Sequence, residues 1–376
     1  MNEKEISEIR RRFSASKSNI NHIRGCCVST EKEILAEFDQ SLAFLTEDET
    51  GKILSLIKKT LSGYIGRNLI DIEFSTKQVL ESDEHKMLMD IRNSSLGDDE
   101  AVQSLYRRII DSVEMEGNYI ILLAEDKYDV PSHGVDGERR DESSEMFRYF
   151  ICCICPIKAS KSQLGFYISG NPFRSVSADT VIAMPELGFM FPAFDDRTAN
   201  IYKTLMYTKD TKADYSSFVE SVFRSEVIPL PAETQRQTFN TILEQTANES
   251  CNLHVVKTLH NQINEMIEEH KERKDEETLL IDKNKFVDLL ESSGLEEKQI
   301  EAFSDKFNSE FGEKTQITPR NIVETRSFNL KTPDVVIKVN PKRTDLIKTR
   351  VIDGEKYILI SAEEEVEVNG VTITIS

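Results

Sequence analysis

Two short acidic segments of the sequence hold the residue types that a metal-dependent nuclease uses. Glu125 and Lys127 directly follow an apolar stretch, and Asp71 and Glu73 alternate within another. In one large class of nucleases a carboxylate holds Mg²⁺ and a lysine two residues on polarises the attacking water. Acid-x-Lys triplets also arise by chance in a chain with 30% charged residues, and strand ends commonly turn polar. A metal-dependent nuclease or phosphohydrolase built on these four residues is therefore one interpretation, and a solvated strand end is the other.

The basic residues are concentrated in two windows of an otherwise acidic chain. Residues 1–24 hold six Lys or Arg against three Glu, and residues 331–350 hold six against two Asp. Basic side chains gathered in this way can lie along phosphates, and the second window would form a clamp if it folds as a hairpin. The competing interpretation is that they neutralise acidic faces of the same chain. The candidate nucleic-acid-binding residues are Arg10, Arg11, Arg12, Lys17, Arg24, Lys342, Arg343, Lys348 and Arg350.

The other residues that could bind a metal or take part in catalysis do not predict a metal or cofactor site. Cys153 and Cys155 would share one face of a strand and Cys152 the other, and two thiolates are too few to close a zinc site. Asp195 and Asp196 precede a stretch with helical spacing, so helix capping explains them better than anion or metal binding. The phosphate-loop, His-Glu-x-x-His and Gly-x-Ser-x-Gly motifs are absent from the sequence. We expect no cofactor and no metal.

Composition restricts the class of protein. The chain has 376 residues and a formal net charge of −19, which excludes a uniformly basic nucleic-acid coat but allows a local basic face. The longest apolar runs, at 119–124 and 149–157, are far shorter than the roughly 20 residues that a membrane helix needs. The six cysteines lack the spread spacing of an extracellular disulfide framework. The sequence predicts a cytoplasmic protein without a membrane partner.

Local signals predict the helices and strands of the N-terminal half, which must position the acidic segments. A capping box formed by Thr46 and Glu49 starts a helix that ends before Gly63. A second helix is expected over 98–113, where acidic residues at its start favour the positive end of the helix dipole. The apolar runs that follow predict two paired internal strands. With helices first and a mainly antiparallel sheet after them, residues 1–210 are expected to form an α+β domain.

In the rest of the chain the spacing of apolar residues changes twice, first to that of helices and then to that of strands. Helical spacing begins after Asp195, where Ile201, Tyr202 and Leu205 form the first apolar stripe, and it continues to about residue 312. Beyond that point, Asp353-Gly354 and Asn369-Gly370 are tight hairpin turns between alternating apolar residues. We predict an α+β fold of three domains, namely an α+β domain at 1–210, a helical domain at 211–312 and a small β meander at 313–376.

Four stretches of the sequence, at 20–26, 37–42, 68–76 and 191–202, carry a resemblance to a known family. Through them the chain closely resembles, over essentially its full length, the bacterial domain of unknown function 4317 family, which implies no established activity. The order of predicted elements is more distantly similar to that of the bacterial nucleoid-associated protein family, whose members are acidic, cytoplasmic and of comparable size. That similarity implies association with chromosomal DNA or with proteins acting on it, and it transfers no functional residue.

These observations predict a non-enzymatic binding protein of the cytoplasm or nucleoid. Its partner would be DNA, another nucleic acid or a nucleoid protein, engaged through the two basic windows. The nuclease or phosphohydrolase is the first alternative. A purely protein-binding module is the second, because an acidic surface suits a basic partner. Self-association into a homo-oligomer is left open.

Overall fold

The computed structural model describes residues 1–14, 16–133, 139–159, 163–166, 173–176, 180–225, 228–273, 275, 277–362 and 366–374. The chain divides into two compact units, each of which is described by itself. Unit 1 comprises Met1–Ala232 with Glu276–Thr278, and unit 2 comprises Glu233–Asp275 with Leu279–Ser376. No helix in these ranges is both long and apolar enough to cross a membrane. The three-domain division at 210 and 312 stays a prediction.

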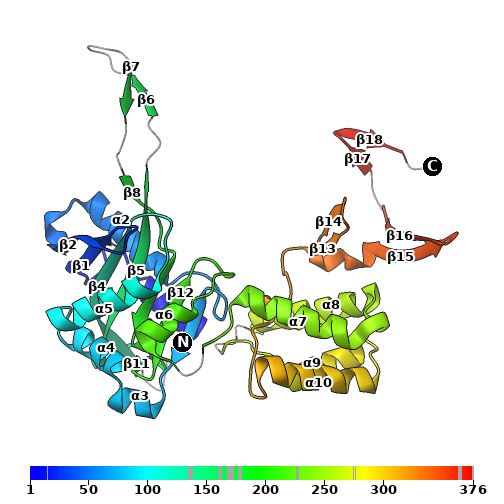
Figure 1. The fold of residues 1–376 in the computed structure, drawn as a ribbon, viewed down its shortest axis with the longest axis horizontal. Helices are drawn as coiled ribbons and strands as arrows, with labels where there is room; N and C mark the ends of the chain where they lie inside the picture. Colours follow the sequence, from blue (N-terminus) through cyan, green and yellow to red (C-terminus); the bar gives the residue numbers. More distant parts are fainter. Residues whose placement is uncertain are drawn as a thin grey trace. The chain divides into compact units, whose positions relative to one another are not determined.

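Unit 1 is built around one antiparallel sheet (Figure 1). Its strands follow the order β2-β1-β4-β5-β9-β12-β3, and β8 pairs with β5 outside this path. They are β1 (His22–Val28), β2 (Ile34–Ser41), β3 (Leu69–Glu73), β4 (Tyr119–His133), β5 (Arg139–Ala159), β8 (Thr180–Ile182), β9 (Leu187–Phe191) and β12 (Lys203–Thr208). Because β4 and β5 lie inside the sheet, their apolar runs are buried, which confirms the predicted pair of internal strands.

Helices cover both faces of this sheet (Figure 1). One face packs against α4, α5 and α6, and the other packs against α1 and α2. The helices of unit 1 are α1 (Glu3–Arg10), α2 (Glu47–Thr60), α3 (Thr76–Glu81), α4 (Asp83–Asn93), α5 (Asp99–Ser112) and α6 (Ser216–Phe223). As predicted from the alternation of a strand, Cys152 lies in the first core and Cys153 and Cys155 lie in the second. The predicted helices at 46–61 and 98–113 are α2 and α5, and the Thr46–Glu49 capping box is present.

The stretch after Asp195 is a hairpin followed by a strand, so the helix predicted there is wrong. Strand β10 (Ala193–Asp195) turns into β11 (Thr198–Asn200) through Asp196 and Arg197, whose φ angles of 50° and 59° suit a tight hairpin turn. Asp195 and Asp196 therefore cap no helix. Strand β12 follows and lies between β9 and β3, so pairing on both sides overrides the helical spacing of its apolar residues. The strands also begin earlier than predicted, because β1 and β2 precede α2.

Unit 2 joins a helical core to three hairpins. Its core is formed by apolar side chains of four long helices and of α11, and Phe239, Phe286, Phe303 and Phe307 are in ring contact within it. The helices are α7 (Ala232–Ala247), α8 (Leu253–Arg273), α9 (Lys283–Ser292), α10 (Glu297–Phe311) and α11 (Pro319–Ile322). The hairpins pair β13 (Phe328–Lys331) with β14 (Val336–Val339), β15 (Ile347–Ile352) with β16 (Glu355–Ile360), and β17 (Val366–Val368) with β18 (Val371–Ile373). The α+β class, the helical middle and the β end are confirmed, with separate hairpins in place of one continuous meander.

Candidate nucleic-acid interface

The N-terminal basic window is anchored on unit 1 by its apolar residues. Ile6 and Ile9 of α1 pack on the sheet, and Phe13 follows them into the same core. This packing brings Arg12 beside Asp126, with which it forms two hydrogen bonds, Nε to Oδ2 at 2.8 Å and Nη2 to Oδ1 at 3.0 Å. The guanidinium of Arg12 therefore neutralises an acid of its own chain, as the competing interpretation of the basic windows expects.

The other four candidate nucleic-acid-binding residues of this window differ in exposure. Arg24 is buried in β1, where its Nη2 pairs with Oδ1 of Asp99 at 2.6 Å. Arg10 is half-buried, whereas Arg11 and Lys17 are exposed. The prediction that this window contacts phosphate consequently depends mainly on Arg11 and Lys17.

The four candidate nuclease residues are distributed over two distant strands. Asp71 and Glu73 lie on the edge strand β3, whereas Glu125 and Lys127 lie on β4. Three strands, β5, β9 and β12, separate β4 from β3 in the sheet, which amounts to about 19 Å along it at the usual strand spacing. Because β4 continues to His133, the expectation that Glu125 and Lys127 mark a solvated strand end is also wrong. The sheet order does not bring the four side chains to one site.

Each half of this acidic set is paired locally. Asp71 Oδ2 lies 3.4 Å from the ammonium group of Met1, and burial raises the pKa of Asp71. Glu73 pairs with Lys203 at 3.1 Å, and Glu125 pairs with Lys127 at 3.4 Å. Within the residues that the structure describes, no group of three His, Cys, Asp or Glu side chains is placed to hold a metal ion.

The last residues of the C-terminal basic window lie on β15 of the β15–β16 hairpin, whose register sorts its side chains onto two faces. The turn is made by Asp353 and Gly354, both with positive φ, and the strands pair outward from it, so that Arg350 lies opposite Tyr357. Lys348, two residues from Arg350, lies on the same face, because directly opposed and alternate residues share a face. One face of β15–β16 thus carries two cations and an aromatic ring.

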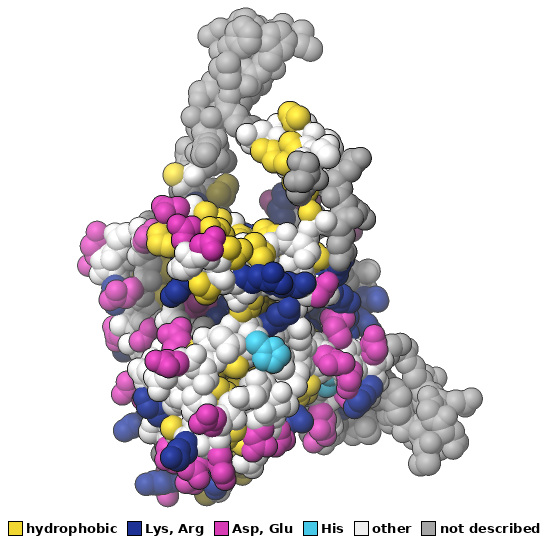
Figure 2. All heavy atoms as spheres, turned by 90° about the vertical axis from the view of Figure 1, so that its right-hand side faces the viewer, with side chains coloured by type: hydrophobic (Ala, Val, Ile, Leu, Met, Phe, Trp, Pro, Cys, Tyr) yellow, Lys and Arg dark blue, Asp and Glu magenta, His cyan; other side chains and the backbone are white. Residues whose placement is uncertain are grey.

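All three of these side chains are accessible. Lys348 and Arg350 are exposed, and Tyr357 exposes 39% of its surface. The hydroxyl of Tyr357 donates to Oε2 of Glu355 at 2.7 Å, and this hydrogen bond raises the pKa of Tyr357. Glu355 is the one carboxylate of this face and lies beside the turn. Figure 2 shows hydrophobic, basic and acidic side chains side by side on the face of the molecule in view.

The opposite face of the same hairpin is mainly apolar. Thr349 pairs with Ile358, and Val351 pairs with Lys356. Val351 and Ile358 are exposed, and Lys356 is the only charged residue on this face. The hairpin therefore carries both of its β15 cations and its aromatic ring on one face, together with Ile352 and Leu359, and mainly apolar side chains on the other.

A short 3-10 helix, η3 (Pro341–Leu346), fixes the base of the hairpin to α8. Thr344 is buried there, and its hydroxyl exchanges hydrogen bonds with the side-chain amide of Asn261 at 3.0 and 3.1 Å. Lys342 and Arg343 of η3, which directly precede Thr344, are exposed. Arg343 Nε lies 3.2 Å from Oδ1 of Asp345, and its hydrogen bonds lower the pKa of Asp345. The predicted residues Lys342, Arg343, Lys348 and Arg350 are thus grouped on one short, anchored segment.

Tyr357 was not among the residues that we predicted, although the sequence contains the signal for it. A two-residue Asp-Gly turn sets the register of a hairpin, and counting outward from 353–354 places position 357 opposite position 350. In proteins that bind single strands, aromatic rings stack on the bases and neighbouring cations contact the phosphates. The arrangement can therefore bind a single strand through both its backbone and its bases.

Comparison with known proteins gives a family and no activity. No curated protein matches the chain. The similarity to nucleoid-associated proteins therefore stays a prediction. A family model described as a domain of unknown function, DUF4317, matches residues 1–371. This match spans nearly the whole sequence, as the resemblance predicted, and the chain belongs to the DUF4317 family.

Proposed function

We propose that the chain binds single-stranded nucleic acid, without catalysing a reaction on it, along the basic face of β15–β16. The observation that carries the proposal is the register of this hairpin, which places Arg350 opposite Tyr357 and Lys348 on the same face. Cations in this position neutralise phosphates, and the ring stacks on a base. Association with a nucleoid protein, and a location in the cytoplasm or nucleoid, stay predictions.

The charge of the segment sets the expected salt dependence. If Lys342, Lys348 and Arg350 each neutralise one phosphate, the log–log slope of affinity against salt is about −2 for a single strand, because Arg343 already pairs with Asp345. A duplex lacks accessible base faces, so Tyr357 would contribute little to its binding. We therefore expect single strands to bind more tightly than duplexes of the same length.

The test is fluorescence anisotropy of the full-length chain with a labelled oligothymidine, the matching RNA and a duplex, across a salt series. Replacing both Lys348 and Arg350 by alanine should reduce the slope by about 1.4. Tyr357→Ala should weaken binding by about 5- to 150-fold, the range measured for loss of one base–aromatic stack, while Tyr357→Phe should retain it. Lys356→Ala is the matched control, because it removes one charge from the opposite face of the same hairpin.

Two outcomes would overturn the proposal. A reduction of the slope by about 0.7 for Lys356→Ala, half that of the Lys348 and Arg350 double variant, would show that binding follows net charge and not this face. Destruction of the labelled strand only when Mg²⁺ is present, abolished by Glu125→Ala, would replace the proposal by the nuclease alternative.

A further inference from the structure

We propose that unit 1 also binds a small organic cation with an apolar body, in a cavity at one end of its sheet. The cavity has a volume of about 560 Å³, within the range of about 300–1,000 Å³ typical of small-molecule sites. Its walls come from the segment between α5 and β4, the start of β9, the segment between β12 and α6, and α6 itself. This site is independent of the hairpin discussed above.

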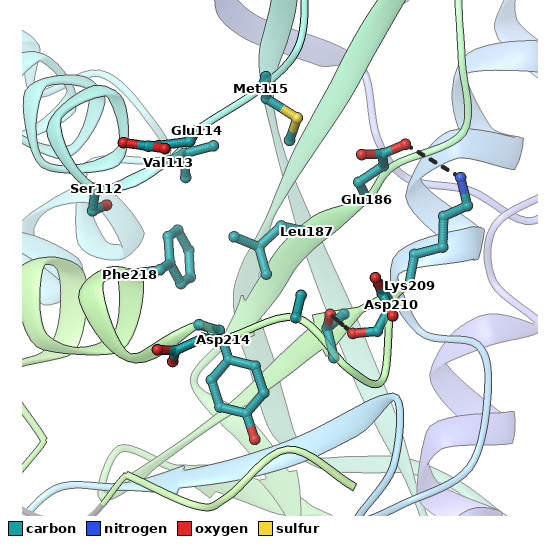
Figure 3. Close-up of a pocket in the computed structure, with 13 residues that line it drawn as sticks. Ser112, Val113, Glu114, Met115, Glu186, Leu187, Lys209, Asp210, Asp214 and Phe218 are labelled. Carbon is teal, nitrogen blue, oxygen red and sulfur yellow. Dashed lines mark hydrogen bonds and ion pairs between the residues drawn. The ribbon is translucent and has the colours of Figure 1, made fainter. Parts of the chain in front are cut away.

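One part of the cavity wall is apolar. Figure 3 shows Leu187 and Phe218 facing each other across it, with the side chain of Met115 nearby. Phe218 and Tyr215 are nearly fully buried and belong to the core under α6, so this wall is held in place by packing. The hydroxyl of Tyr215 donates to the carbonyl oxygen of Pro229 at 2.7 Å, and burial raises the pKa of Tyr215, so its ring is a neutral wall. An apolar group of a ligand would be desolvated here.

The residues around this apolar part are mainly acidic. In Figure 3, Glu186 and Asp210 lie on one side of the Leu187–Phe218 pair, and Glu114 and Asp214 lie on the other. Lys209 is the one basic residue of the lining, and its ammonium group pairs with Glu186 at 3.3 Å. The lining therefore holds four carboxylates against one ammonium group.

Two of these carboxylates are oriented by the backbone around them. Asp210 Oδ1 accepts the backbone N–H of Lys212 at 2.9 Å. Asp214 Oδ1 accepts the hydroxyl of Ser216 at 2.5 Å and its N–H at 2.9 Å, and these hydrogen bonds lower the pKa of Asp214, so it stays charged at neutral pH. The charge of the cavity edge is consequently fixed in place beside the apolar part of the wall.

The two properties together select the ligand class. Carboxylates on an open surface would attract any cation weakly, whereas the apolar part of the wall between them favours a cation that carries an apolar group. An anion of the same shape would be repelled by the edge. A neutral analogue would gain only the contact with Leu187 and Phe218. The expected order of affinity is cation, then neutral molecule, then anion.

The experiment uses the full-length chain with methyl-labelled Met, Leu and Val, and three probes of one shape. These are phenethylamine, which is protonated at neutral pH, 2-phenylethanol and 3-phenylpropionate. Phenethylamine should shift the methyl signals of Met115, Leu187 and Val113 in a saturable manner, with an affinity that falls as salt is raised. Equal binding of the three probes would overturn the proposal, as would shifts confined to methyl groups outside the cavity.

A pair of matched substitutions tests the role of charge. Glu114 and Glu116 are both exposed and lie two residues apart, but only Glu114 lines the cavity. Glu114→Gln should raise the dissociation constant of phenethylamine by about two- to fivefold, the effect of removing one exposed charge, and adding Asp210→Asn should raise it again by a similar factor. Glu116→Gln should leave it unchanged. If Glu116→Gln weakens binding as much as Glu114→Gln, the attraction comes from net charge and the proposal fails.

Discussion

Replacing Arg12 by methionine would leave Asp126 inside unit 1 without its guanidinium partner. The side chain of Asp126 is 1% exposed, and Arg12 donates two hydrogen bonds to it and a third to the carbonyl oxygen of Lys127 at 3.0 Å. Its guanidinium also lies 4.4 Å from the centre of the Tyr128 ring. Burial alone would lower the pKa of Arg12, but its hydrogen bonds to Asp126 and the charge of that group raise it overall.

The expected loss of unfolding free energy follows from these contacts. Removing one partner of a buried ion pair costs about 3–5 kcal/mol, because the remaining charge keeps its desolvation penalty. Asp126 would retain the hydroxyl of Tyr149 at 2.7 Å and the N–H of Lys127 at 2.9 Å. We therefore expect Arg12→Met to cost about 3–4 kcal/mol, in the lower part of that range. Arg11→Met, the same change at the exposed neighbour, should cost less than about 0.5 kcal/mol.

Urea unfolding followed by tyrosine fluorescence measures this loss in unit 1. Of the ten tyrosines, all except Tyr357 lie in the sequence range of unit 1, so the signal reports on that unit. Asp126→Asn and the Arg12→Met/Asp126→Asn double variant complete a thermodynamic cycle, whose coupling energy should be about 1–3 kcal/mol. The slope of free energy against urea should stay constant if only stability changes.

A loss below about 1 kcal/mol for Arg12→Met would refute this reasoning, because that is the range of solvent-exposed ion pairs. A loss that largely disappears in high salt would do the same, since a buried pair is poorly screened. Either result would return Arg12 to the set of cations available for a nucleic acid.

Three further predictions follow from other buried positions. Gly188→Ala should destabilise unit 1, because a Cβ there would stand 2.4 Å from the carbonyl oxygen of Cys152. At Gly51 in α2 a Cβ would meet no atom within 4 Å, so Gly51→Ala should stabilise the protein by about 0.5–1 kcal/mol. Urea unfolding of the two variants compares these effects. Burial lowers the pKa of His85 below its ordinary value of 6.5. As the pH falls through 6.5 the unfolded chain therefore binds more protons than the folded one, and the free energy of unfolding must decrease. An NMR titration that gave the imidazole of His85 a pKa at or above 6.5 would contradict this. Burial raises the pKa of Cys153 to about 12, so its thiol should stay unmodified by a disulfide reagent at about pH 8 until the protein is unfolded, as mass mapping would show.

Local signals in the sequence were sufficient for many elements. The helix α2 could be predicted because its capping box satisfies backbone groups within three residues of its start. The β15–β16 hairpin could be predicted for the same kind of reason, since Asp353-Gly354 sets both the turn and the register. Arg350 and its face of the hairpin were thus accessible to sequence reasoning, and Tyr357 could have been added by counting from the turn.

Contacts between residues that lie far apart in the sequence were decided only by the tertiary structure. The helical spacing in β12 was misleading because strands β9 and β3, which pair with it, supply its hydrogen bonds from distant segments. The same sheet order places three strands between the strand of Asp71 and the strand of Glu125, so the four residues of the nuclease hypothesis do not lie together. Arg12 carries no local sign that distinguishes it from Arg11. Only the packing of α1 on the sheet buries Arg12 against Asp126, because the free energy of desolvating a charge depends on neighbours that the order of residues does not show.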